Sequence, residues 1–257
     1  MDPQERPSYH VQSLVRGLSV IKTFGPGRPE MTLSDVARAA GLTRAGARRF
    51  LLTLVDLGYV RTDGKLFRLT PKVLELGYAF LSSASLPAIA EPHLEWLVKQ
   101  TDESSSVSEL DGPDIVYVAR VPTSRIMRVA ISVGTRFPAH ATSMGQVMLA
   151  GLEEQELDAY LAAVRLESFT DRTITDPSAL RRRLKRVGTA GYALVDQELE
   201  AGLRSIAAPI HDRSGRVVAA VNVSSHVSRV TRAQAMREFL DPLRKAAAAI
   251  AKDLCRT

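Results

Sequence analysis

Apolar residues at helical spacing predict a first helix close to the start of the chain. Residues 13–24 (SLVRGLSVIKTF) place apolar side chains three and four positions apart, and Ser13 is suited to cap the first turn. The face that this spacing would bury contains Leu14, Leu18 and Ile21, with Val15 at its edge. The run GPGRPE at 25–30 cannot continue a helix, so it predicts a loop.

The next segment has the pattern of a helix-turn-helix. Thr32 or Ser34 can cap a short helix, Gly41 allows a sharp turn, and Thr43 can cap the following helix. Two helices joined by a short turn that contains glycine are typical of this motif, whose second helix enters the major groove of DNA. The sequence therefore predicts a DNA-reading helix over residues 44–57.

Opposite faces of that helix differ in character. At about 100° per residue, one face is apolar and the other carries Arg44, Arg48 and Arg49. The predicted buried residues are Ala47, Phe50, Leu51 and Leu54. A glycine inside a helix costs ~1 kcal/mol relative to alanine, so Gly46 needs a reason. Close approach of a DNA backbone and tight helix–helix packing both supply one.

A hairpin is predicted directly after this helix. The strands YVRT and LFRLT flank the turn DGK, and Asp63-Gly64 is a strong hairpin signal. Such a hairpin is a wing, and Arg61, Lys65 and Arg68 would line it near DNA phosphates, although exposed cations are often only solvated. The residues expected to contact DNA are Thr43, Arg44, Ala45, Gly46, Arg48, Arg49, Arg61 and Lys65.

The rest of the chain mixes helices and strands. After the wing, TPKVLELGYAFLSS predicts a helix over 71–84 with Thr70 as cap, which either transmits motion or is a passive linker. Further helices are predicted at 85–103, 142–152, 153–164 and 176–191, and from Thr231 to about Leu254. Strands are predicted at 104–110, 114–121, 125–133, 203–212 and 216–225. This order favours an α+β fold in which helices pack on an antiparallel sheet.

Charge and composition sharpen the functional prediction. Residues 1–80 carry 12 Lys and Arg against 7 Asp and Glu, and residues 81–257 carry 22 against 21. A basic small domain beside a nearly neutral large one suggests a polyanionic partner, although a merely basic surface would also produce this excess. No apolar run is long enough to span a membrane, no signal peptide is evident, and Cys255 is the single cysteine, so we expect a cytoplasmic protein.

Several segments together resemble the IclR family of transcription regulators. They include LSDVARAAGLTRAGARRFLLTL, FRLTPKVLELG, FPAHATSMGQVMLA, GYALVDQELEAGLRSIAAPI and VNVSSHVSRVT. The resemblance implies a winged helix-turn-helix over 1–70, a linker helix over 71–84, and a GAF-like effector-binding and oligomerisation domain over 85–257. It also implies a homodimer or a dimer of dimers on double-stranded operator DNA.

Within the family, RVPTSRIMRVAISVGTRFPAHATSMG and ALVDQELEAGLRSIA resemble the aromatic-acid regulators of the PcaR, PcaU and PobR branch. That branch controls protocatechuate and β-ketoadipate pathway genes, so the implied effector is an aromatic acid or a β-ketoadipate-like acid. Regulation of another small-carboxylate pathway is the alternative.

Polar residues that interrupt apolar strands indicate where an effector would bind. Asn222 and Ser224 alternate with valines and share one sheet face, and Ser205 interrupts another strand, so this face is either a pocket or solvent-exposed. Family effector positions correspond here to Ile126, Val129, Phe137, Ser143, Met144, Asp196, Leu203, Ser205, Asn222 and Ser224. Ser205 stands where a cysteine is common in the family, and Asn222 where a serine is.

A buried effector carboxylate needs a cation or strong donors. Arg125, Arg128 and His140 are the nearest candidates, and we include Arg128 in the predicted site. The amides at the helix start near Ser143 are the alternative. Pairing of the arginines with surface acids would remove them from the site.

The hypotheses of an enzyme and of an RNA-binding protein have less support. The chain contains no G-x-S-x-G, Walker P-loop, H-E-x-x-H, C-x-x-C or G-x-G-x-x-G pattern, and its five histidines are scattered. We therefore expect no catalytic residues, metal or cofactor, with an enzyme acting on a small carboxylate as the weaker alternative. An RNA-binding surface would need exposed aromatic residues, and none lies on the basic face of helix 44–57.

Overall fold

The computed structural model describes residues 10–25, 27–77, 85–123 and 131–256. The chain forms two compact units, Met1–Ser82 and Ser83–Thr257, each with its own hydrophobic core. Within the described ranges, no helix combines the length and the apolar character that crossing a bilayer requires. The same residues contain no group of three or more His, Cys, Asp or Glu side chains suited to hold a metal ion.

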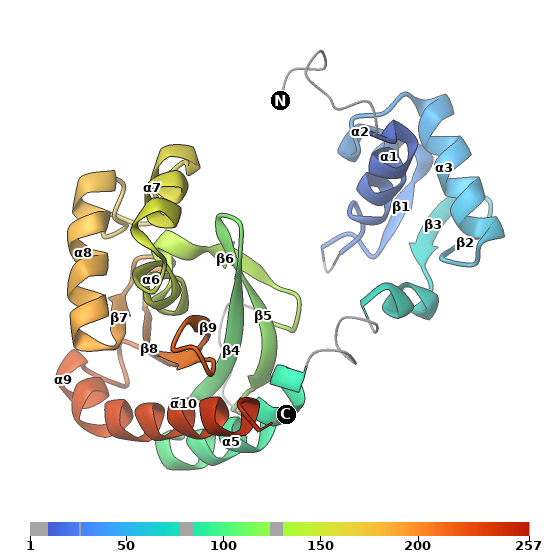
Figure 1. Cartoon of the computed structure of the whole chain (residues 1–257). Coiled ribbons are helices and arrows are strands. Elements are labelled where there is room, and N and C mark those ends of the chain that lie inside the picture. Colours follow the sequence, from blue (N-terminus) through green and yellow to red (C-terminus); the bar gives the residue numbers. More distant parts are fainter. Residues whose placement is uncertain (1–9, 26, 78–84, 124–130, 257) are drawn as a thin grey trace. The chain divides into compact units, whose positions relative to one another are not determined.

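The amino-terminal unit is a small winged helix-turn-helix (Figure 1). It contains α1 (Gln12–Ile21), β1 (Glu30–Thr32), α2 (Leu33–Ala39), α3 (Arg44–Asp56), β2 (Val60–Thr62) and β3 (Leu66–Leu69). The three strands form an antiparallel sheet in the order β1-β3-β2. The predicted hairpin is confirmed, and only β1 was not predicted.

The local signals for α2 and α3 are also confirmed. The Thr32 hydroxyl accepts a hydrogen bond from the Asp35 amide, and the Thr43 hydroxyl accepts one from the Gly46 amide. Gly41 lies between the helices with a φ of +63°, a left-handed conformation that glycine adopts at low cost. Caps and turn together set the angle at which α3 leaves α2.

The predicted buried face of α1 is confirmed only at Ile21, which packs on the core. Leu14 is 62% exposed and Leu18 is 44% exposed, whereas Val20 is fully buried. The helix packs on α3, and a Cβ atom at Gly17 would lie 3.8 Å from the Phe50 ring, which is an ordinary contact. The buried side carries Val20 and Ile21, and the apolar spacing alone does not reveal which side of the helix faces the core. The capping residue is Val11 and not Ser13, and it provides no side-chain hydrogen bond.

The segment after the wing is only partly described. The Thr70 hydroxyl accepts a hydrogen bond from the Lys72 amide, and a short 3₁₀ turn, η2 (Pro71–Val73), follows as the cap predicts. Residues 74–77 are α-helical. The remainder of the predicted linker helix, 78–84, lies outside the described residues.

The carboxy-terminal unit is built on a six-stranded antiparallel sheet, and the predicted α+β architecture is confirmed. Its strands are β4 (Ser104–Asp111), β5 (Asp114–Val121), β6 (Arg136–Pro138), β7 (Ala193–Asp196), β8 (Leu203–His211) and β9 (Val217–His226). Their order in the sheet is β6-β5-β4-β9-β8-β7. The short edge strands β6 and β7 were not predicted. The described end of the strand expected at 125–133, residues 131–133, is not a strand, and 124–130 lies outside the described residues.

Helices cover both faces of this sheet (Figure 1). On one face, α5 (Ser85–Thr101) lies beside α10 (Leu240–Leu254), which continues from α9 (Arg232–Gln234) and the π-helical turn η4 (Ala235–Phe239). On the other face, η3 (Ala139–Ala141) and α6 (Ser143–Ala150) pack on the strands, with α7 (Glu154–Ala163) and α8 (Pro177–Ala190) beyond. Each face has its own apolar core.

Candidate functional site

The exposed face of α3 is basic. Arg44, Arg48 and Arg49 are exposed, whereas Ala47 and Leu51 are fully buried on the opposite face, as the helical wheel predicts. Within the described residues, none of the three arginines forms an ion pair with a carboxylate. Unpaired guanidinium groups on one helix face can donate to base edges and phosphate oxygens.

The structure explains the glycine at position 46 by a contact that neither sequence-based hypothesis, DNA approach or helix–helix packing, included. A Cβ atom built on Gly46 would lie 3.1 Å from the Thr43 hydroxyl oxygen and within 4 Å of no other group outside its own helix. Tight helix–helix packing is therefore wrong as an explanation. The glycine leaves room for the hydroxyl that caps α3, so it supports the start of the helix.

The wing adds two further unpaired cations. Arg61 and Lys65 are exposed and, within the described ranges, have no acidic partner. Arg68 differs, because its guanidinium lies 2.9 Å from Glu30 and 3.8 Å from Asp63, which compensate its charge. The prediction that Arg68 is a free cation of the wing is therefore wrong.

Helix α3 and the wing border one groove. The walls contain Arg44 and Arg48 from the helix and Thr62, Gly64 and Lys65 from the hairpin. Arg44, Arg48 and Lys65 thus face a shared space, which Thr62 and Phe67, paired across the hairpin, also line. Its chemistry suits a polyanion.

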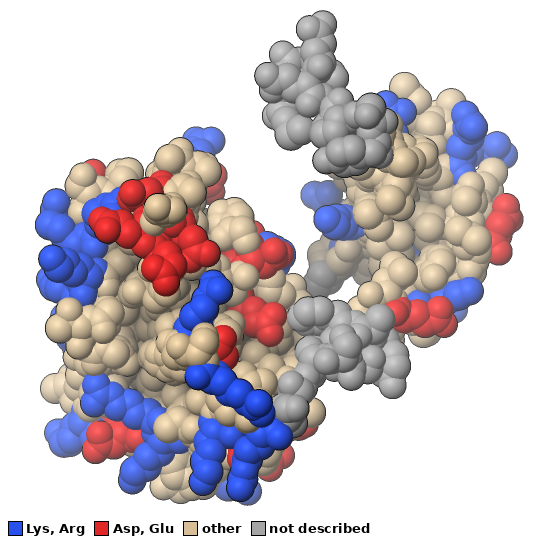
Figure 2. Space-filling model, in the orientation of Figure 1, with Lys and Arg blue, Asp and Glu red and all other residues tan. Residues whose placement is uncertain are grey.

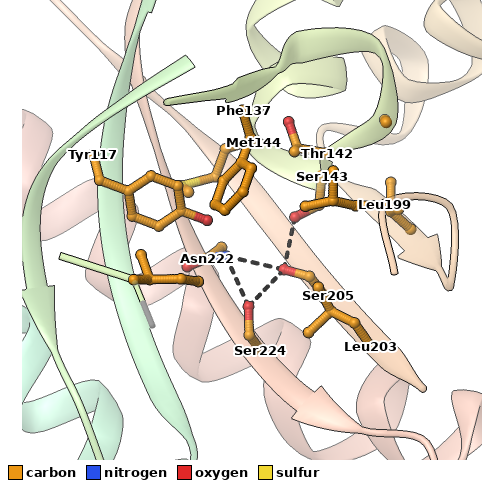
Figure 3. Close-up of a pocket in the computed structure, with 13 residues that line it drawn as sticks. Tyr117, Phe137, Thr142, Ser143, Met144, Leu199, Leu203, Ser205, Asn222 and Ser224 are labelled. Carbon is orange, nitrogen blue, oxygen red and sulfur yellow. Dashed lines mark hydrogen bonds between the residues drawn. The ribbon is translucent and has the colours of Figure 1, made fainter. Parts of the chain in front are cut away.

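A pocket in the carboxy-terminal unit lies between the sheet and the start of α6 (Figure 3). Of the eight predicted effector residues that the structure describes, seven line it: Phe137, Ser143, Met144, Leu203, Ser205, Asn222 and Ser224. Asn222 is 3% exposed and Ser224 is 6% exposed. Their shared strand face is therefore a buried pocket wall and not a solvent-exposed surface.

The polar floor of the pocket is a compact hydrogen-bonded network. The Ser143 and Ser205 hydroxyl oxygens lie 2.8 Å apart, which joins α6 to β8. The Asn222 side-chain amide donates to the hydroxyls of Ser205 and Ser224 at 3.0 Å, and these hydroxyls also bond to each other (Figure 3). Hydroxyls can rotate to donate or accept, so the floor can bind either a hydrogen-bond donor or an acceptor of the ligand.

Aromatic and apolar side chains form the remaining walls. The rings of Tyr117 and Phe137 meet edge to face, with centroids 5.8 Å apart. The Tyr117 hydroxyl points into the pocket (Figure 3), and burial raises the pKa of this group to about 12, which keeps it a neutral donor. Lining residues that the sequence reasoning missed are Tyr117, Ile131, Ala141, Thr142, Val195 and Leu199. Tyr117 could have been found, because it interrupts an apolar strand as Asn222 does.

Some predicted residues lie elsewhere. Asp196 is not among the lining residues, and its carboxylate lies 2.9 Å from Arg204 and 3.2 Å from Arg172. His140 is also not among them, and its Nε2 lies 3.0 Å from the Glu167 carbonyl oxygen. Burial lowers the pKa of His140 more than this contact raises it, which favours the neutral ring. Ile126, Arg128, Val129 and Arg125 lie outside the described residues.

The described pocket is tight and has no charged lining residue. Only about 30 Å³ is open to the centres of water molecules, so a larger ligand requires the lining side chains to move. Among the described residues, Arg120 provides a cation on the sheet face that carries the pocket floor. Arg120 and Asn222 both pair with Ser106 across neighbouring strands, and directly opposed residues share a face. The Arg120 guanidinium donates to the Ser106 hydroxyl at 3.3 Å.

Behind α6, a buried polar chain links the pocket helix to α8. The Gln146 side chain donates to a Glu198 carboxylate oxygen at 2.9 Å and accepts from Arg183 Nε at 3.0 Å. Burial, opposed by Arg183 and Gln146, raises the pKa of Glu198 to about 6. Glu198 precedes Leu199 of the pocket wall, so this chain supports one side of the pocket.

Known proteins show similarity over both units. The family model for the carboxy-terminal domain of the bacterial transcriptional regulator IclR matches residues 78–252, and the IclR helix-turn-helix domain model matches residues 13–64. A Pca regulon regulatory protein from Pseudomonas putida is 45% identical over 244 residues, which cover 95% of this chain and 82% of that protein.

Solved structures agree with these matches. A transcriptional regulator from Rhodococcus sp. RHA1 is 56% identical with a TM-score of 0.86, over 96% of this chain and 99% of that one. An IclR homologue from Microbacterium hydrocarbonoxydans, complexed with 4-hydroxybenzoate, is 28% identical with a TM-score of 0.82, over 95% and 100% of the two chains.

Proposed function

This chain belongs to the IclR family of transcription regulators, and we propose that it regulates genes of aromatic-acid catabolism in the protocatechuate and β-ketoadipate pathways. It is a transcription regulator and not an enzyme. The observation that carries the proposed specificity is the pocket, which combines facing aromatic rings with a floor of hydroxyl and amide groups. Acting on chromosomal operators, such a regulator works in the cytoplasm.

We propose that α3 reads operator DNA in the major groove. Arg44 and Arg48 would contact bases or phosphates from the helix start, while Arg61 and Lys65 would contact the neighbouring backbone from the wing. Their exposure and their lack of acidic partners among the described residues support this assignment. The remaining proposed contacts are Thr43, Ala45, Gly46 and Arg49.

We propose that the pocket binds a hydroxylated aromatic acid. The ring would lie against Phe137 and Tyr117, and a phenolic hydroxyl would bond to the serine and asparagine floor. Arg120 would move from Ser106 toward the carboxylate, because a buried carboxylate needs a cation and no described lining residue is charged. The relative complexed with 4-hydroxybenzoate supports this ligand class.

The tightness of the pocket favours one alternative, a regulator that responds to a smaller carboxylate. The open space, about 30 Å³, accommodates small molecules with less rearrangement than an aromatic ring demands. In either case the effector must bind one conformation of the chain better than another, because only differential affinity shifts an equilibrium.

We also propose a homodimer, with a dimer of dimers on DNA as the larger assembly. The exposed apolar face of α1, with Leu14 and Leu18, supports contact with another copy. A two-fold symmetric dimer matches a palindromic operator. Sedimentation of the chain with and without operator DNA measures both assemblies.

The experiment is a gel shift on the gene's own upstream region. Binding is measured at several salt concentrations, alone and with protocatechuate, 4-hydroxybenzoate, β-ketoadipate or pyruvate. A shift in affinity with an aromatic acid supports the proposal, and a response to pyruvate alone supports the smaller effector. Absence of binding to any promoter fragment would overturn the regulator's proposed DNA contacts.

Variants of one strand test the pocket. The double substitution Asn222→Ala, Ser224→Ala removes two floor groups, so we expect the effector response to disappear while DNA affinity without effector stays unchanged. Ser225→Ala is the matched control, because Ser225 is equally buried on the other face of β9. If the double variant still responds to the effector, the effector binds at a site other than this pocket.

A further inference from the structure

A second groove of the carboxy-terminal unit lies away from the effector pocket, and three arginines line it. Arg183 and Arg186 lie one turn apart on α8, and Arg232 comes from α9. The groove shares no lining residue with the effector pocket. Figure 2 shows Lys and Arg side chains gathered along the α8 edge of this unit, beside a group of acidic side chains near α7.

The three guanidinium groups form no direct ion pair within the described residues, although Arg183 interacts at longer range with the Glu198 carboxylate. By contrast, Arg181 on the same helix pairs with Asp158. Arg183 is held by neutral acceptors instead, donating to the Gln146 side chain and to the Leu194 carbonyl oxygen at 2.5 Å. Burial lowers the pKa of Arg183 most, the nearby Glu198 carboxylate raises it, and Arg186 and Arg232 lower it by smaller amounts. Like charges that face one space are relieved by a bound anion.

The floor of the groove is apolar. Val187 and Ala190 of α8, Tyr192, Leu194 and Met236 form it. Met236 belongs to η4, where the helix widens into a single π-helical turn. Such turns are rare and often accompany functional sites. The space open to the centres of water molecules is about 190 Å³, far more than in the effector pocket.

We propose that this groove binds a small organic anion that carries two or more carboxylate or phosphate groups on a short apolar skeleton. The separated cations suit a polyanion better than a single charge, because each guanidinium can take a different oxyanion group. The apolar floor suits a carbon skeleton better than inorganic phosphate, which offers nothing to bury against it.

The groove is also connected to the effector pocket. Arg183 contacts Gln146, which lies on α6, and the first turn of α6 carries Ser143 of the pocket floor. Gln146 in turn holds Glu198, the neighbour of Leu199 in the pocket wall. An anion that draws Arg183 outward would weaken this chain, so occupancy of the groove would alter effector affinity, and the coupling would be reciprocal.

Calorimetric titration of the full chain with citrate at constant ionic strength tests the proposal. We expect citrate to bind, and inorganic phosphate to bind at least tenfold more weakly. The double substitution Arg186→Ala, Arg232→Ala should weaken citrate binding at least tenfold. The matched control is Arg182→Ala, Lys185→Ala, which removes the same charge from exposed positions of α8 outside the groove and should leave citrate affinity unchanged.

Three results would overturn the anion site. The first is no citrate binding to the unsubstituted chain, and the second is an equal loss in both double variants, which would mean diffuse attraction. The third is unchanged citrate binding to the Arg186→Ala, Arg232→Ala variant, and weaker operator binding or altered sedimentation of that variant would then assign the groove to DNA or to another copy. These readouts do not depend on the effector, so the groove can fail while the proposed function stands.

Discussion

Replacing Gly145 by alanine is expected to destabilise the carboxy-terminal unit, although alanine favours helices. Gly145 lies in α6, where its amide donates to the Thr142 hydroxyl that caps the helix. A Cβ atom at this position would lie 2.1 Å from the Ala139 carbonyl oxygen and 2.4 Å from the Ala139 Cα atom. Both are backbone atoms of η3, so the new methyl group cannot be accommodated by a side-chain rotation.

The magnitude follows from two opposing effects. Helix propensity favours alanine over glycine by ~1 kcal/mol. Overpacking a dense interior costs ~1–3 kcal/mol, and a clash with backbone at this distance belongs at or beyond the upper end. We therefore expect a net loss of about 2 kcal/mol or more, which lowers the unfolding temperature of a unit of this size by roughly 4–8 °C.

Gly188→Ala is the matched control. A Cβ atom at Gly188 of α8 would lie 3.5 Å from the Ala150 carbonyl oxygen, an ordinary contact, so propensity alone should act. We expect a gain of up to ~1 kcal/mol. Thermal unfolding of both variants by calorimetry, together with effector titration, provides the comparison. An unchanged or higher unfolding temperature for Gly145→Ala would refute the argument from the η3 contact.

Three further predictions concern charge. Arg44→Ala should reduce the slope of log binding constant against log salt by about 1 if Arg44 contacts phosphate, and an unchanged slope and affinity in gel shifts would exclude it from the interface. The pKa of Glu198 is raised to about 6, so the native state binds the proton more tightly than the unfolded state, and stability falls as pH rises from about 4.5 to 6. Glu198→Gln should remove this dependence and raise the free energy of unfolding at pH 7 by about 2 kcal/mol, as measured by urea unfolding. If the unfolding free energies of the variant and the unsubstituted chain change with pH in parallel, the prediction is wrong. Arg229→Ala should lower the free energy of unfolding by about 3 kcal/mol, because its partner Glu103, at 2.8 Å, is buried. Arg237→Ala, which removes an exposed pair with Glu238, should lower it by under about 1 kcal/mol. Similar losses in the two variants would refute the argument from burial.

Local features of the chain were predictable because each depends on neighbouring residues. Thr32 and Thr43 cap their helices, Gly41 takes a positive φ, and Asp63-Gly64 turns the hairpin. The alternation of Asn222 and Ser224 also placed both side chains on one strand face, although it did not distinguish a pocket wall from a solvent-exposed surface. These signals required no knowledge of what packs against them.

Packing partners were not predictable in the same way. The buried side of α1 carries Val20 and Ile21, and only the folded unit decides that Leu14 and Leu18 on the same helix stay exposed. The short strands β6 and β7 exist because β5 and β8 offer edges to pair with. Periodicity over three or four residues is too weak a signal to predict such strands.

The sequence by itself therefore determined most of the helices, the longer strands, several caps and turns, and the residue types available for DNA and for an effector. Tertiary structure alone decided which of those residues meet. It joined Ser143 to Ser205, compensated Arg68 with Glu30, and brought Arg232 to the groove of Arg183. The physical reason is that hydrogen-bonded turns and helical periods act between near neighbours, whereas burial and charge pairing depend on segments that only the folded chain brings together.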